Sequence, residues 1–294
     1  MPSPFYESVA GCVSGGAMRS ALDLPLIFLS VLAWLGAEAT EAQTAAQRGI
    51  ELSELTWLQA EEVLGPETIV VIPLGAASKE HGPHLRLDND LRMAEYLTRR
   101  VLEVSDVVVA PAIPYHFYPA FLEYPGSTHL SFDTARDLVV DIVRSLADYG
   151  PTRFYVLNTG VSTTGPLQAS AGVLQERNIL LRFTDVFEVA RQAEEAVREQ
   201  VRGTHADEVE TSVMLYMAPD RVDMSLAVRD DNPAGRGGLT RHANGTATYS
   251  PTGIWGDPTL ATWEKGRIIV EAIVEGILHD IEQLRATSIS PLAR

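Results

Sequence analysis

The chain is almost without cysteine, since Cys12 is the only one in 294 residues. Cys12 lies upstream of a predicted cleavage site after Ala39, so the mature chain would carry no thiol. Disulfide bonds, thiolate metal ligands and a cysteine nucleophile are therefore excluded from the mature protein. A metal site in it has to be built from imidazole and carboxylate groups.

Positive charge is also scarce, with 23 Lys and Arg against 39 Asp and Glu and a formal net charge of -16. No stretch of clustered Lys or Arg interrupts this acidity, and nonspecific nucleic-acid binding needs a basic surface. Nucleic acid is therefore excluded as a partner. Internal repeats, heptads and a nucleotide-binding glycine loop are absent as well. At 46% hydrophobic and 21% charged residues, the composition is that of an ordinary globular chain.

Long apolar runs are missing apart from residues 24–35, which are too few to span a bilayer but suit the apolar region of a signal peptide. Ala37-Glu-Ala39 supplies a small-x-small cleavage pattern. We therefore expect a signal peptide over residues 1–39, export to the periplasm or the medium, and a single membrane-free domain over residues 40–294. The basic flank is only Arg19, so a buried N-terminal helix is the alternative. Met18 is a second candidate for the true start.

The sequence is organised around one polar loop, which follows a continuously apolar, β-branched segment at residues 68–74. Such a segment is typical of a parallel strand buried on both faces. Loops at the C-terminal ends of these strands are where open α/β sheets bind ligands. Gly82 and Pro83 fix a turn that can aim neighbouring side chains at one point. The loop offers five oxygen or nitrogen ligands: Glu80, His81, His84, Asp88 and Asp90.

Carboxylate and imidazole without thiolate suit zinc, manganese or a similar divalent ion. A carboxylate such as Asp90 could also bridge two ions about 3.5 to 4 Å apart. The alternative is a polar turn whose side chains only cap the helix expected from Leu91. In that case Asp88 or Asp90 would be its N-cap.

Hydrophobic periodicity predicts an α/β fold with a parallel sheet. The expected strands cover residues 68–74, 107–113, 153–158 and 179–186. The expected helices cover residues 51–65, 91–104, 134–149, 189–201, 209–217 and 262–284. A loop at residues 230–253, rich in Gly, Asn and Pro, is long enough to be a lid or an oligomer contact.

Two further loops could contribute to a site. Residues 115–126 are rich in aromatics, which either wall a small substrate pocket or belong to the core. The loop at residues 159–166 offers hydroxyls and backbone N–H groups that can bind substrate oxygens. We assign Ser162 and Thr163, together with His84 of the first loop, to substrate binding. His116 and His129 are additional loop histidines that could serve as metal ligands.

Three ordered motifs resemble the creatininase family. Pro73-Leu-Gly-Ala followed by Glu80-His-Gly-Pro-His84-Leu, with an acid at Asp90, resembles its signature strand and loop. His205-Ala-Asp-Glu-Val-Glu-Thr-Ser resembles its H-A-G-E-x-E-T-S segment. Trp255-Gly-Asp-Pro-Thr-Leu-Ala and Glu264-Lys-Gly-Arg267 resemble its C-terminal G-D-P-x-x-A and E-K-G-R. The resemblance covers most of the region from Ile69 to Leu284.

The resemblance implies a three-layer αβα sandwich with a mostly parallel sheet, and hydrolysis of a small amide or cyclic amide. It implies a site for one or two zinc or manganese ions on Glu80, His81, Asp90 and Glu210. His205 would be the catalytic proton carrier beside the metal, since its unperturbed pKa of about 6.5 suits transfer near neutral pH. A small-molecule substrate and a homo-oligomer, with the hexamer as the family's typical form, are implied in the same way.

Two departures from the family pattern put a two-metal site in question. The family's first metal-binding Glu falls on Lys79 in this register, and the metal-binding His of its second loop falls on Gly160. We expect the extra residue after Gly75 to form a bulge that turns Glu80 to the metals, with Lys79 pointing away or contacting substrate. The alternative is that Lys79 occupies the old ligand position. Two rival functions remain open: an exported, non-catalytic binding protein, and a metal-dependent lactone or ester hydrolase.

Overall fold

The computed structural model describes residues 47–232 and 237–288. The chain divides into two units, Met1–Gln43 and Thr44–Arg294, and everything below concerns the second unit. The predicted signal peptide lies outside the described residues. Among the described residues, no helix combines the length and apolar character needed to cross a membrane.

Five parallel strands form the main sheet in the order β1-β3-β2-β4-β5. The central strand β2 is buried at every residue, as its unbroken apolar sequence predicts. It pairs along its full length with β4, from Ile69 opposite Arg153 to Leu74 opposite Asn158. A second sheet contains only β6 and β7. The strands are β1 Ile50–Glu51, β2 Ile69–Leu74, β3 Val108–Val109, β4 Arg153–Asn158, β5 Leu180–Phe183, β6 Leu239–Thr240 and β7 Thr248–Tyr249.

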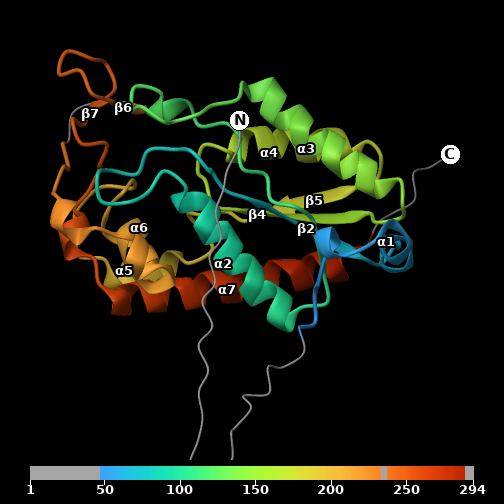
Figure 1. The fold of residues 1–294 in the computed structure, drawn as a ribbon. Helices are drawn as coiled ribbons and strands as arrows, with labels where there is room; N and C mark the ends of the chain where they lie inside the picture. The colour runs from blue at the N-terminus through green and yellow to red at the C-terminus, as the bar shows by residue number, and fades with distance from the viewer. Residues whose placement is uncertain (1–46, 233–236, 289–294) are drawn as a thin grey trace, which may run out of the picture. The chain divides into compact units, whose positions relative to one another are not determined.

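Helices cover both faces of the main sheet, which confirms the predicted three-layer αβα sandwich (Figure 1). Ile69 and Val71 of β2 point into a core shared with α2 and α7. Their neighbours Val70 and Ile72 point into the opposite core, shared with α3 and α4. The helices are α1 Trp57–Val63, α2 Asn89–Val104, α3 Phe132–Ala147, α4 Thr164–Gln175, α5 Arg191–Val197, α6 Glu208–Met217 and α7 Trp263–Ala286.

Several elements differ from the sequence-based expectation. Strand β1 overlaps the start of the helix expected over residues 51–65, and β6 and β7 lie in the loop expected at residues 230–253. The strand expected over residues 107–113 is reduced to β3, with only an isolated bridge from Ile113 to Leu74. Helix α3 is capped by the Ser131 side chain, so it begins at Phe132, before the expected start at residue 134. Helix α4 was not predicted at all. Its first turn contains Gly165 and Pro166, which read as loop, although proline is tolerated where the N–H has no intrahelical partner.

The site lies at the topological switch point of the sheet. The connection after β2 runs through α2 on one face, whereas the connection after the adjacent β4 runs through α4 on the other face. Loops that leave neighbouring strands toward opposite faces open a crevice at the strands' C-terminal ends. The polar loop at residues 75–88 and the loop at residues 159–163 border this crevice.

Candidate active site

Three of the predicted metal ligands come together. One ligand atom from each of His81, Asp90 and Glu210 lies within 4.8 Å of the other two. His81 comes from the loop after β2, Asp90 from the first turn of α2, and Glu210 from the first turn of α6. They form the only such group found among the residues that the structure describes.

The ring of His81 is oriented as in a metal ligand. Its Nδ1 lies 2.9 Å from the carbonyl oxygen of Lys79, so Nδ1 carries a hydrogen and donates it. Its Nε2 lies 2.7 Å from Asp90 Oδ1, a carboxylate oxygen that only accepts. A neutral ring that donates from Nδ1 has no hydrogen left on Nε2. The contact between Nε2 and Asp90 Oδ1 therefore requires either a protonated ring or another cation beside these two atoms. A backbone carbonyl that fixes the far nitrogen is the usual arrangement around a metal-bound histidine. The residues present therefore fit a divalent ion.

Lys79 is turned into the site. Its Nζ lies 2.8 Å from Asp90 Oδ2, and the two side chains are 6% and 1% exposed. Its Nζ also lies 5.0 Å from the ring centroid of Phe121 and 5.6 Å from that of Tyr118. Burial favours the neutral amine, but the charges of Asp90, Glu210 and Glu80 outweigh it and raise the pKa of Lys79. Burial alone would also raise the pKa of Asp90, yet the charges of Lys79 and His81 lower it. Lys79 therefore does not point away from the ligand group, and because it also lines the cavity described below, its contact with substrate remains a prediction.

Glu80 lies beside His205 and is not one of the three clustered ligands, which differs from its predicted role as a metal ligand. One of its oxygens is 3.1 Å from His205 Nε2, and the other accepts a hydrogen bond from the backbone N–H of Gly82. The turn at Gly82 and Pro83 therefore folds the carboxylate back onto its own loop. The side chains of Lys79 and Glu80 point to different partners, as expected of neighbours in an extended segment.

His205 is held between two carboxylates. Its Nε2 faces Glu80, and its Nδ1 lies 3.5 Å from Glu210 Oε2. The ring packs against Phe121 with centroids 4.3 Å apart. Burial lowers the pKa of His205, but the hydrogen bond to Glu80 and the charges of Glu210 and Glu80 outweigh burial and raise it. The ring therefore favours the protonated form beside Glu210.

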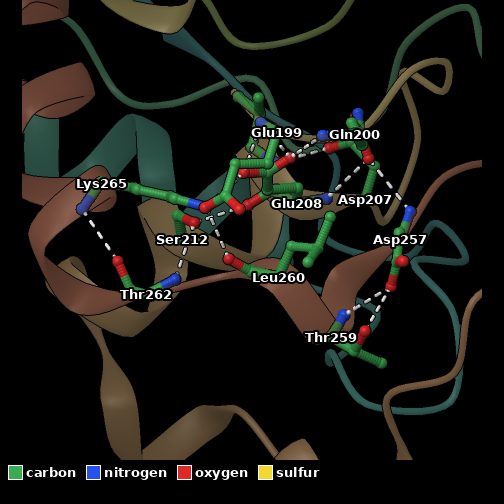
Figure 2. A network of polar contacts seen from close by, with 11 residues as sticks. Glu199, Gln200, Asp207, Glu208, Ser212, Asp257, Thr259, Leu260, Thr262 and Lys265 are labelled. Atoms are coloured by element: carbon green, nitrogen blue, oxygen red, sulfur yellow. Dashed lines mark hydrogen bonds and ion pairs between the residues drawn. The ribbon is translucent and has the colours of Figure 1, made fainter. Parts of the chain in front are cut away.

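A polar network holds Asp207 and Glu208, which lie between His205 and Glu210 in the chain (Figure 2). Asp207 caps α6 by accepting hydrogen bonds from the N–H groups of Val209 and Glu210, both at 3.0 Å. Ala206, which precedes this cap, adopts a left-handed φ of 49° and donates its N–H to Glu210. A non-glycine residue held in this region is strained and is often found at functional sites.

The C-terminal motifs complete this support. Lys265 of α7 reaches Glu208 of α6 with 2.5 Å between Nζ and Oε1, and Glu208 is 1% exposed at its side chain (Figure 2). Gly266 lets the two helices approach closely, because a Cβ there would lie 1.8 Å from the carbonyl oxygen of Ser212. The E-K-G-R and H-A-D-E-V-E-T-S segments are therefore joined by direct contacts. Together they fix the direction of Glu210.

A cavity of about 330 Å³ opens beside His205 and Glu210. Ser162, predicted to bind substrate, lines it together with Lys79. Thr163 instead donates its hydroxyl to Asn158 and Gly160, and His84 Nε2 contacts Thr211 Oγ1 at 2.8 Å. Neither Thr163 nor His84 is among the residues that line this cavity, which include Tyr118, Phe121, Gly160, Gly238, Leu239 and Trp255.

The other polar candidates have structural contacts. Asp88 stands at the N-cap position of α2 without a capping bond, and its carboxylate pairs with Arg92 and Arg221. His116 Nε2 lies 3.1 Å from the carbonyl oxygen of Ala135, and His129 accepts the N–H of Tyr118. Neither histidine belongs to the clustered ligand group.

The sequence did not identify the surroundings of His205. The aromatic loop at residues 115–126 could be read as pocket wall or as core, and both readings apply: Phe121 is buried, lines the cavity and packs on His205. The role of Glu80 as the partner of His205 also went unrecognised. A signal was present, since Glu80 stands directly beside His81 in the ligand-rich loop. The separation of 125 residues between the two partners hid it.

Comparison with known proteins gives one consistent family. The family model described as "Creatininase: Creatinine amidohydrolase" matches residues 53–281. Creatinine amidohydrolase of Pseudomonas putida is 26% identical over 255 residues, which cover 80% of this chain and 97% of that protein. Mycofactocin precursor peptide peptidase of Mycolicibacterium smegmatis is 30% identical over 224 residues, which cover 73% of this chain and 85% of that protein.

Solved structures show the same fold. A crystal structure of creatinine amidohydrolase has a TM-score of 0.69 at 22% identity, covering 81% of this chain and 99% of that chain. A creatininase structure described as a manganese form has a TM-score of 0.67 at 23% identity, and a mutant creatininase described as Zn-Zn type has 0.68 at 22%. Each of these two covers 80% of this chain and 98% of its own.

Proposed function

The chain belongs to the creatininase family, and from that premise we propose that it is a metal-dependent amidohydrolase that acts on a small amide or cyclic amide. The observation that supports this proposal most directly is the convergence of His81, Asp90 and Glu210 beside the protonatable His205. Ligand atoms, proton carrier and cavity lie together at the switch point of the sheet. Catalytic sites in open α/β folds occur at this place.

His81, Asp90 and Glu210 would hold zinc or manganese. An ion bound there would act as a Lewis acid on a carbonyl oxygen and on water. The nitrogen and oxygen donors match both metals, and both appear in the descriptions of creatininase structures with this fold. The carbonyl of Lys79 keeps His81 Nε2 directed at the site by accepting from Nδ1.

His205 would carry the proton that amide cleavage requires. Breaking a C–N bond needs a proton on the leaving nitrogen, and a positioned histidine can supply it. Glu80 and Glu210 keep that proton on the ring, because both carboxylates favour the imidazolium. Phe121 covers one ring face and limits access of water from that side.

Hydrolysis of an amide bond is the reaction that the names of the two relatives share, since creatinine is a cyclic amide and a peptidase cleaves peptide bonds. We favour the small amide because the cavity of about 330 Å³ lies at the lower end of the size range of ligand pockets, about 300 to 1,000 Å³.

The proposal is tested by metal content and hydrolysis together. The full chain, purified without chelator and supplied with zinc or manganese, should bind metal stoichiometrically and release product from creatinine or another small cyclic amide. Asp90→Asn should lose most of the metal and the activity, because one ligand charge is removed. Asp88→Asn, in the same loop but outside the ligand group, should keep both. A chain that binds no metal under these conditions would sink the proposal.

The non-catalytic rival is supported by the Lys79 ammonium, which occupies part of the site. Under that rival, the protein would bind a small amide in calorimetry without turning it over, whatever metal is added. The lactone or ester hydrolase shares the same residues and differs only in the leaving group. Parallel assays with a cyclic amide and the lactone of the same ring size separate these two hydrolases.

A further inference from the structure

The second oxygen of Asp90 is already occupied by a cation of the chain itself. Asp90 Oδ1 faces His81 within the ligand group, whereas Asp90 Oδ2 lies 2.8 Å from Lys79 Nζ. A carboxylate commonly bridges two metal ions by offering one oxygen to each. Here one oxygen is directed to an ion site and the other to an ammonium group.

The ammonium is held in place from several sides. Lys79 is 5% exposed as a residue, and the rings of Tyr118 and Phe121 lie 5.6 Å and 5.0 Å from its Nζ. Cations are attracted to aromatic ring faces at such distances. Lys79 could leave Asp90 only by losing this ion pair and both ring contacts. A second divalent ion at Asp90 Oδ2 would have to displace it.

The position of a second metal ion, beside Lys79, also lacks a ligand from residue 160. Gly160 lines the same cavity and carries no side chain, and a Cβ built on it would lie 3.3 Å from the Tyr118 ring. The Tyr118 ring therefore borders both Lys79 and Gly160. Within the described residues, no second cluster of three His, Asp or Glu ligands exists.

We propose that the site holds one divalent ion, on His81, Asp90 and Glu210, and that the Lys79 ammonium takes the place of a second ion at Asp90 Oδ2. This inference rests on the proposed function for its first ion and adds the stoichiometry. The resulting centre differs from the creatininase structure described as Zn-Zn type. Lys79 supplies a fixed positive charge at the cavity wall. It also keeps the second oxygen of Asp90 from binding metal.

The measurement is the number of ions per chain. Full-length wild type, titrated with zinc and freed of excess metal, should contain one ion by elemental analysis. Lys79→Glu replaces the ammonium by a carboxylate and should take up two. Lys79→Met only removes the competing charge and should bind the first ion at least about tenfold more tightly. Arg86→Met, which removes a positive charge from the exposed part of the same loop, should behave like wild type.

A second measurement needs no variant. Wild type saturated with manganese should give the electron paramagnetic resonance signal of isolated ions, without the exchange coupling of a close pair. Two ions per wild-type chain, or a coupled signal, would overturn the inference while leaving the proposed function in place. One ion in both wild type and folded Lys79→Glu would show that Lys79 does not exclude the second ion. No ion in any variant would instead refute the proposed function.

Discussion

His205 has the environment of a proton carrier at the scale of the single residue. It contacts Glu80 and Glu210 through its two ring nitrogens, and it is not among the clustered ligands. Its contribution to turnover should therefore be separable from metal binding. From the sequence, the place of His205 beside the metal followed only from the resemblance to the family.

His205→Gln should lower kcat by about 10² to 10⁴-fold, because the leaving nitrogen loses its proton donor. Metal content, measured by elemental analysis on the same preparation, should not change. His242→Gln is the matched control, since the His242 side chain is 79% exposed. Activity within a few-fold of wild type in His205→Gln would show that another group delivers the proton.

Glu194 is an acid placed where its charge is unfavourable. It lines a small internal cavity together with Asp207 and Glu210. Burial, followed by the charge of Asp207, raises the pKa of Glu194 to about 7. A carboxyl whose pKa is higher in the folded than in the unfolded chain lowers stability above the folded pKa. This loss of stability disappears as the pH falls through about 7 toward the lower pKa that the carboxyl has in the unfolded chain.

Glu194→Gln should therefore stabilise the protein at pH 8, by about 1 to 2 kcal/mol after allowance for its partial exposure. The gain should shrink at pH 5, where the folded wild type already binds the proton. Urea unfolding at the two pH values measures the difference. Glu195→Gln, an exposed neighbour on the same helix, should show no comparable gain. Equal effects of Glu194→Gln at pH 8 and pH 5 would contradict the raised pKa.

At the scale of elements, the contact between α6 and α7 determines where Glu210 points. Glu208 accepts hydrogen bonds from the N–H groups of Glu199 and Gln200 and pairs with Lys265. The Lys265 side chain is 12% exposed, so the pair is largely removed from water. Such a pair is sensitive to the loss of one partner, because the other charge is then buried alone.

Lys265→Met should destabilise the protein by about 2 to 4 kcal/mol, because it leaves the Glu208 carboxylate buried without a counter-charge. Adding Glu208→Gln to the same chain should recover most of this loss. Denaturant unfolding of the two single variants and the double variant forms the cycle. If the double variant is destabilised by the sum of the two single changes, the charge pair does not have this role.

The helices and strands differ in how far their own residues specify them. The strands β2 and β4 were predicted almost residue by residue, because buried parallel strands have continuous apolar runs. Helix α4 was missed, since Gly165 and Pro166 in its first turn are loop signals. Its position is decided by packing on α3 and the sheet rather than by helix propensity.

At the scale of the whole molecule, the signal peptide and the homo-oligomer remain predictions. The cleavage pattern at Ala37-Glu-Ala39 precedes the described residues, which begin at residue 47. The resemblance to the family predicts a hexamer, and light scattering of the purified mature chain would measure the assembly. Neither expectation changes the site, whose residues all lie within Thr44–Arg294.

The full chain expressed in a bacterial host should be recovered from the periplasmic fraction with Thr40 as its first residue. The apolar run at residues 24–35 is the reason, because it has the length of a signal peptide's apolar region. Intact-mass spectrometry of the fractionated protein measures the processing. Protein that stays in the cytosol with residues 18–39 still attached would refute export.

The sequence by itself determined the family, the αβα layers, and the residues His81, Asp90 and Glu210. Local signals, an apolar strand and a ligand-rich loop after it, identified His81 and Asp90, whereas the family, the layers and Glu210 followed from the resemblance of three ordered motifs. Tertiary structure alone decided that Lys79 turns inward to Asp90 and that Glu80 turns to His205. Lys79 and Glu80 are neighbours in the chain, and either could have faced the metal. The rings of Tyr118 and Phe121 stabilise the ammonium, whereas His205, 125 residues away, receives the carboxylate. Such a choice depends on charges and surfaces that meet only when distant segments fold together.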